Sequence, residues 1–137
     1  MKRLEDILQE ACVTWFKLQY PKVTILHPKN EGNRKSLVSK ANGKSYSPDG
    51  NRNKKMGVLA GTPDLFVMKV HSHETFENNY FDVTIYHGLW IELKAPGRTQ
   101  SKEQKEFEVK AKAEGYAYYV CKSVDEFMTV VNNYLGS

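Results

Sequence analysis

The sequence has little cysteine and no long apolar run, and each shortage excludes a class of protein. Its two cysteines, Cys12 and Cys121, form no Cys-x-x-Cys pair, which argues against a disulfide scaffold or a zinc cluster and fits a reducing cytoplasm. No apolar stretch approaches the ~18 residues that a membrane span needs. The acids within "MKRLEDILQE" at residues 1–10 do not fit a signal peptide. We therefore expect a cytoplasmic protein with no membrane partner.

The 137 residues of the chain suit one hydrophobic core, so we expect a single domain over residues 1–137.

The chain is also short of acidic residues in one segment. The net charge of +4 is uneven, because residues 29–55 contain eight basic side chains against Glu31 and Asp49. Concentrated positive charge favours a polyanion such as nucleic acid, although a solvated loop explains it about equally well. The eight are Lys29, Arg34, Lys35, Lys40, Lys44, Arg52, Lys54 and Lys55.

Apolar periodicity predicts an α/β protein. In the first helix, over residues 4–18, helical spacing places six side chains toward the core: Leu4, Ile7, Leu8, Ala11, Trp15 and Leu18. Further helices are expected at 101–114 and 124–135, and strands at 23–27, 64–70, 80–88 and 116–121, with 80–88 paired through a loop to the strand "LWIELK". Residues 29–55 read as a long flexible loop, crowded with Gly, Asn, Ser and Lys. The order α-β-β-β-α-β-α predicts a small mixed sheet flanked by helices on both faces.

The stretch "GLWIELKAPG", residues 88–97, places an acid and a base in a strand bound for the core. Because side chains alternate along a strand, Glu92 and Lys94 share the face opposite Leu89 and Ile91. Burying two ionisable groups is costly unless they meet a counter-charge or a metal. The pair is therefore either a salt bridge or part of a site.

Asp64 favours the site. It follows Pro63 in "GTPDLF", at the start of a predicted strand, where a proline is tolerated and a carboxylate can reach a cleft. On a strand beside Glu92, Asp64 would converge with Glu92 and Lys94. Two carboxylates with waters suit Mg²⁺, and a neighbouring lysine can polarise a water or stabilise charge on a phosphate. We therefore predict phosphodiester hydrolysis.

These residues carry a resemblance to a known family. "GTPD" followed by "IELK" is similar to the PD-(D/E)XK nuclease signature, and the finer match is to the VRR-NUC family of that superfamily. The matching features, in order, are a glutamate on the first helix, "GVLAGTPD", "GLWIELKAPG" and "SKEQ". The resemblance covers nearly the whole chain and implies a restriction-endonuclease-like core.

The resemblance also implies residue roles. Asp64 and Glu92 would bind the metal with the Leu93 backbone carbonyl, Lys94 would be the catalytic base or electrostatic stabiliser, and Gln104 would assist. Gln104 has a structural alternative, because Ser101 and Gln104 have the spacing of a helix capping box.

An acid on the first helix completes the set that the resemblance implies. A helical projection places Glu5 on the flank of the apolar stripe and Glu10 on the far side, facing solvent. Glu5 is therefore the expected catalytic and metal-binding acid.

The activity implied is that of a Mg²⁺- or Mn²⁺-dependent DNA endonuclease with no organic cofactor. Small members of the family resemble viral or bacterial proteins acting inside the host cell, which pair as homodimers and cut branched DNA such as four-way junctions. The eight basic residues of 29–55 then become expected phosphate contacts. Two alternatives stay open: a monomeric flap-directed, end-directed or nicking nuclease, and a non-catalytic DNA-binding module.

Overall fold

A four-stranded mixed sheet forms the centre of the protein. The computed structural model describes residues 3–28, 37–38, 45–46, 52 and 54–136. The sheet strands, in spatial order, are β1 (Thr24–Leu26), β4 (Leu65–Met68), β7 (Leu89–Leu93) and β8 (Ala117–Cys121). The first two pairings are antiparallel and the β7–β8 pairing is parallel, which confirms the predicted mixed sheet.

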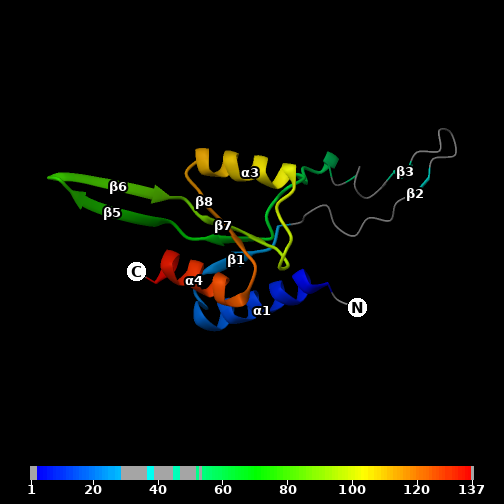
Figure 1. Ribbon diagram of the computed structural model, residues 1–137, viewed down its shortest axis with the longest axis horizontal. Helices are drawn as coiled ribbons and strands as arrows, with labels where there is room; N and C mark the ends of the chain where they lie inside the picture. Colours follow the sequence, from blue (N-terminus) through cyan, green and yellow to red (C-terminus); the bar gives the residue numbers. More distant parts are fainter. Residues whose placement is uncertain (1–2, 29–36, 39–44, 47–51, 53, 137) are drawn as a thin grey trace.

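Helices cover both faces of this sheet. Helices α1 (Leu4–Gln19) and α4 (Val124–Leu135) lie on one face, and α3 (Lys102–Ala113) lies on the other and connects the parallel strands β7 and β8 (Figure 1). All three lie within a residue of their predicted bounds. Ser101 caps the start of α3, and Gly115, at φ +85°, follows its end. No helix in the described ranges is long and apolar enough to cross a bilayer.

The prediction for the buried side of α1 was partly wrong. Leu4, Ile7 and Leu18 are 69%, 50% and 80% exposed, whereas Cys12 and Phe16 are fully buried. Leu8 and Trp15 of the predicted side pack at the margin of the core. The fully buried side is centred instead on Cys12 and on Phe16, whose ring packs against Tyr20. This orientation turns the side that carries Glu5 toward the sheet, because residues 5, 12 and 16 lie close together on a helical projection.

One predicted strand pairing was also wrong. Residues 80–88 were expected to pair with "LWIELK", but β6 (Tyr80–Tyr86) pairs with β5 (His71–Glu77) over seven residue pairs. Both edges of β7 are taken by β4 and β8, so no edge is left for β6. Asn78 and Asn79, both at positive φ, form the two-residue turn between the strands, as is usual for a tight hairpin.

The predicted loop at 29–55 contains two short strands among its described residues. β2 (Leu37–Val38) and β3 (Ser45–Tyr46) pair with each other. Arg52, Lys54 and Lys55 are exposed. The other five predicted phosphate contacts lie outside the described residues: Lys29, Arg34, Lys35, Lys40 and Lys44.

Candidate active site

The two acidic residues predicted to form a site lie together at one end of neighbouring strands. Leu65 of β4 is opposite Ile91 of β7, so Asp64 reaches the end of β7. The Leu93 backbone N–H donates a 2.7 Å hydrogen bond to Asp64 Oδ2. Glu92 is only 3% exposed, and Asp64 is half-buried. The strand register therefore produces the expected convergence of residues 64 and 92.

Burial and the neighbouring Asp64 carboxylate make Glu92 costly to ionise. Burial, followed by the charge of Asp64, raises the pKa of Glu92 to about 9, against a smaller opposing effect of Lys94. Burial also raises the pKa of Asp64, opposed by the hydrogen bond from the Leu93 N–H and by a side-chain hydrogen bond with Glu92. Adjacent buried carboxyl groups resist carrying two negative charges unless a cation joins them.

Lys94 supplies one positive charge to this pair. Its Nζ lies 3.8 Å from Glu92 Oε1, and its side chain is only 12% exposed. Its backbone N–H donates to the Cys121 carbonyl at 3.0 Å, which fixes Lys94 at the end of the β7–β8 pairing. The salt bridge, which was the alternative to a site, is present, but it involves Glu92 alone and does not explain the Asp64 carboxyl beside it. A simple ion pair therefore does not account for the site.

Gln104 forms the predicted capping box and also contacts Glu92. The capping box is complete, because the Ser101 N–H donates to Gln104 Oε1 at 2.8 Å and the Gln104 N–H donates to Ser101 Oγ at 3.2 Å. The same side chain donates from Nε2 to Glu92 Oε1 at 3.0 Å. The box fixes the orientation of the amide, since its oxygen is held at the helix start and its nitrogen must point to Glu92.

Gly61 allows the start of α3 to approach this closely. Its φ is +86°, and a Cβ built on it would lie 2.4 Å from the backbone oxygen of Glu103. A side chain at this position would therefore clash with the first turn of α3 as well as strain the backbone. The glycine of the "GTPD" motif thus brings Gln104 up to the carboxylates.

The first turn of α1 adds a third carboxylate. Glu5 is half-buried, and its Oε1 accepts a 3.2 Å hydrogen bond from the Ala95 backbone N–H. Its charge contributes to raising the pKa of both Asp64 and Glu92. The position of Glu5 is therefore the one expected of the acid chosen from the helical projection.

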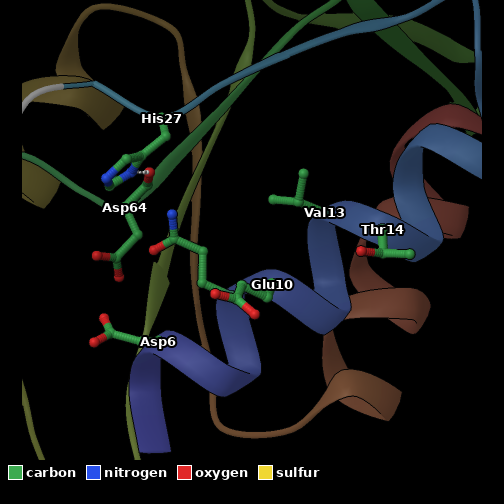
Figure 2. A pocket seen from close by; sticks show the side chains of 7 residues that line it. Asp6, Glu10, Val13, Thr14, His27 and Asp64 are labelled. Carbon is green, nitrogen blue, oxygen red and sulfur yellow. Dashed lines mark hydrogen bonds between the residues drawn. The ribbon is translucent and has the colours of Figure 1, made fainter. Parts of the chain in front are cut away.

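Glu10 is exposed, as predicted, and it lines an open pocket of about 720 Å³ that Asp64 also lines. Figure 2 shows Asp6 and Glu10 on α1 across this pocket from His27 and Asp64.

Two contributors to this region were not predicted. Asp6 lines the same pocket, and the His27 Nδ1–H donates to the Asp64 backbone carbonyl at 2.6 Å. The donor is assigned to the ring because a carbonyl can only accept. An acid directly after Glu5 was the only signal for Asp6, and nothing in the sequence indicated the His27 contact, which needs the β1–β4 pairing.

The residues at this site fit a hard divalent cation. No hydrogen-bond donor among the described residues reaches the buried Glu92 Oε2. In the metal-free protein the Glu92 and Asp64 carboxyls share a hydrogen bond that needs a proton, and when both groups are ionised a cation must take the place of that proton. Among the residues that the structure describes, no three His, Cys, Asp or Glu side chains are already grouped so that they could hold a metal ion. Two carboxylates would thus need water or backbone oxygens to complete the coordination, which suits Mg²⁺. The Leu93 carbonyl stays a prediction for one of those positions.

The fold and the site define a protein of the restriction-endonuclease-like α/β class. A solved structure described as "VRR_NUC domain protein" superposes with a TM-score of 0.69 at 27% sequence identity, over 99% of this chain and 92% of that chain. The sequence also matches the VRR-NUC domain family over residues 3–125. The chain belongs to the VRR-NUC family, which confirms the resemblance and implies a nuclease whose substrate is DNA. A search of curated proteins gave no match.

Proposed function

We propose that the protein is a divalent-metal-dependent DNA endonuclease that cuts branched DNA such as four-way junctions as a homodimer. The observation that carries the proposal is the junction of β4, β7 and α3. There, Asp64 lies beside a buried Glu92, and Lys94 and Gln104 both lie near the same oxygen of Glu92, Oε1. A purely structural salt bridge does not need the second carboxylate.

Asp64 and Glu92 would hold Mg²⁺ or Mn²⁺, with the Leu93 carbonyl and Glu5 as further oxygen donors. When bound, such an ion lowers the pKa of a coordinated water and neutralises charge on a phosphodiester. The two carboxylates contribute negative charge, which favours a cation, and the low exposure of Glu92 limits competition from water.

Lys94 would stabilise the negative charge that develops on the phosphate or orient the attacking water. Its ammonium group is largely buried, so its electrostatic effect is stronger there than at an exposed position. Gln104 would act as a positioning residue through its bond to Glu92 Oε1. That bond leaves Glu92 Oε2 available to a cation.

Recognition of DNA would depend on shape and charge. The basic residues of 29–55 supply positive charge for phosphate contacts, and no base-reading motif is evident in the sequence. A homodimer would provide the two active sites that symmetric cuts across a branch require.

A cleavage panel tests this proposal. Labelled linear, flap and four-way DNA would be incubated with Mg²⁺, Mn²⁺, Ca²⁺ or EDTA. We expect paired cuts in the four-way substrate with Mg²⁺ or Mn²⁺ and none with EDTA. Cutting confined to flaps or single strands would replace the junction substrate by the monomeric alternative. DNA binding without cleavage under every metal would contradict the enzymatic proposal.

A further inference from the structure

Strands β5 and β6 form a two-stranded ribbon that extends from the body of the protein (Figure 1). Their register sorts the side chains onto two faces, because neighbours alternate along each strand. One face, called the apolar face below, carries Phe76, Phe81, Val83 and Ile85, which are 69%, 57%, 41% and 52% exposed. Four neighbouring apolar side chains of this exposure are unusual on a monomer and mark an interaction surface.

The opposite face of the ribbon is the one attached to the protein. At its base the His71 ring lies 5.1 Å from the Tyr134 ring of α4. The Tyr134 hydroxyl also donates to the Lys69 carbonyl at 2.5 Å, just before β5. Since His71 belongs to the polar face, this attachment directs the apolar face away from α4.

The charge of the ribbon argues against a nucleic-acid partner. It carries Glu74, Glu77 and Asp82, and no lysine or arginine occurs between residues 70 and 93. A polyanion would be repelled by this segment. The ribbon also extends from the end of the molecule opposite the first turns of α1 and α3, where the active-site residues lie (Figure 1). Its apolar face is therefore suited to a protein.

We propose that the apolar face packs against the same face of a second copy of this chain, around a two-fold axis. This contact would be the interface of the homodimer, and in this respect the inference rests on the proposed function. An isologous interface requires one self-complementary patch. The face has six positions, of which four are apolar: all three on β6 and Phe76 on β5. Its other two positions, Ser72 and Glu74, both lie on β5, so packing centred on β6 would leave the Glu74 carboxylate at the edge of the contact.

Stability gives an independent reason for a covering partner. A two-stranded hairpin is marginally stable in water unless a further layer covers its apolar face. Packing two ribbons face to face builds such a layer from identical parts, as in a small sandwich of sheets. The ribbon of seven residue pairs would then be ordered by the dimer over its whole length.

Solution mass tests the interface with a matched pair of double variants. Phe81→Lys with Ile85→Lys charges the apolar face, and Thr75→Lys with Thr84→Lys adds the same charge to the polar face of the same ribbon. Sedimentation over a concentration series should show a dimer for the wild type and the second variant. We expect the first variant to dissociate about 100-fold more readily, with an unchanged far-ultraviolet spectrum. A monomeric wild type, or equal dimerisation of both variants, would overturn the proposal.

Disulfide trapping tests the same contact without disrupting it. Val83 is central on the apolar face, so Val83→Cys should form a covalent dimer on oxidation, whereas Thr84→Cys on the other face should not. The native Cys12 and Cys121 are fully buried and do not compete. Equal trapping of the two variants, or none for Val83→Cys, would contradict the proposal. Both measurements use no DNA or metal, so their failure leaves metal-dependent cleavage intact and removes only the homodimer from the proposed function, while loss of cleavage leaves the interface untouched.

Discussion

Glu92 is a buried carboxylate that meets a second carboxylate, an ammonium group and a side-chain amide within one site. Of its two oxygens, Oε1 interacts with Gln104 and Lys94, and no hydrogen-bond donor among the described residues reaches Oε2. The pKa of about 9 expresses the cost of ionising it in the metal-free protein. A divalent cation at this position would reverse that cost, because it favours the ionised form.

The metal-free protein should become less stable as pH rises. Glu92 ionises at its ordinary pKa of 4.5 when unfolded but at about 9 when folded, so the folded state binds more protons between these values. The contribution of Glu92 to the free energy of unfolding is thus full below pH 4.5 and is lost progressively toward pH 9. Thermal unfolding in EDTA should show the midpoint falling with pH over this window, less steeply for Glu92→Gln. Parallel curves for the two proteins would contradict the expectation.

Lys94→Ala should separate catalysis from binding. Removing a buried charge that stabilises a transition state typically lowers the rate by ~10²–10³-fold, so single-turnover cleavage should fall by at least that factor. DNA affinity, measured by fluorescence anisotropy, should change little, because Lys94 is one of twenty basic residues. Lys102→Ala, at an exposed position on α3, is the control and should cleave normally. Cleavage by Lys94→Ala at the wild-type rate would remove Lys94 from the mechanism.

At the residue scale, the sequence predicted those parts of the site that depend only on strand alternation and on neighbouring residues. Strand alternation put Glu92 and Lys94 on one face, and the Pro63–Asp64 pair marked the start of the neighbouring strand. The buried side of α1 was predicted only in part, because it depends on how the helix is rotated against the sheet. That rotation is decided by the fit of Phe16 in the core, which no local pattern reports.

At the scale of elements, the start of α3 connects a helix cap to the site. The capping box holds the amide oxygen of Gln104, and the amide nitrogen bonds Glu92. The glycine at position 61 makes room for this approach. A single helix start thus stabilises α3 and orients a carboxylate.

Ser101→Ala and Gln104→Ala should therefore have different effects. Loss of the Ser101 cap should lower the free energy of unfolding by ~1 kcal/mol and leave Gln104 near Glu92, so cleavage at saturating metal should be little changed. Gln104→Ala should cost a similar stability but also lower the rate and weaken metal affinity. Chemical denaturation and single-turnover kinetics on both variants would measure the difference. If the two variants lose activity equally, the bond to Glu92 has no functional role.

Elements were predicted better than their pairing. The three described helices follow from apolar periodicity and caps, because these signals lie within each segment. The pairing of β6 with β5 instead of β7 could not be read from the strand itself. It follows from the occupation of both β7 edges and from the Asn78–Asn79 turn, and such competition between strands is a property of the whole sheet.

At the scale of the molecule, charge is distributed unevenly. The segment 29–55 is strongly basic, while residues 70–93 contain no basic residue. DNA would thus be drawn to one part of the surface, and the acidic ribbon would stay free for protein contact. The resemblance indicated a homodimer, but it gave no surface for it, since the exposed apolar face appears only once the β5–β6 register is known.

DNA binding should weaken steeply with salt. A protein making about six to ten phosphate contacts loses ~10³–10⁵-fold in affinity between 50 and 200 mM salt, and eight basic residues lie in 29–55. Replacing the exposed Lys54 and Lys55 by alanine should reduce the slope of log affinity against log salt by about two. Anisotropy titrations in Ca²⁺ at several salt concentrations would measure it. An unchanged slope would exclude these two lysines as phosphate contacts.

The most direct measurement is a calorimetric titration of Mn²⁺ into the metal-free protein and into three variants. Wild type should bind one ion per active site, and Asp64→Asn and Glu92→Gln should each weaken that binding by at least ~10-fold, because each removes one of the two converging carboxylates. Glu106→Gln, an exposed acid on α3, should bind like wild type. Wild-type affinity in either active-site variant would show that residues 64 and 92 do not share a metal ion.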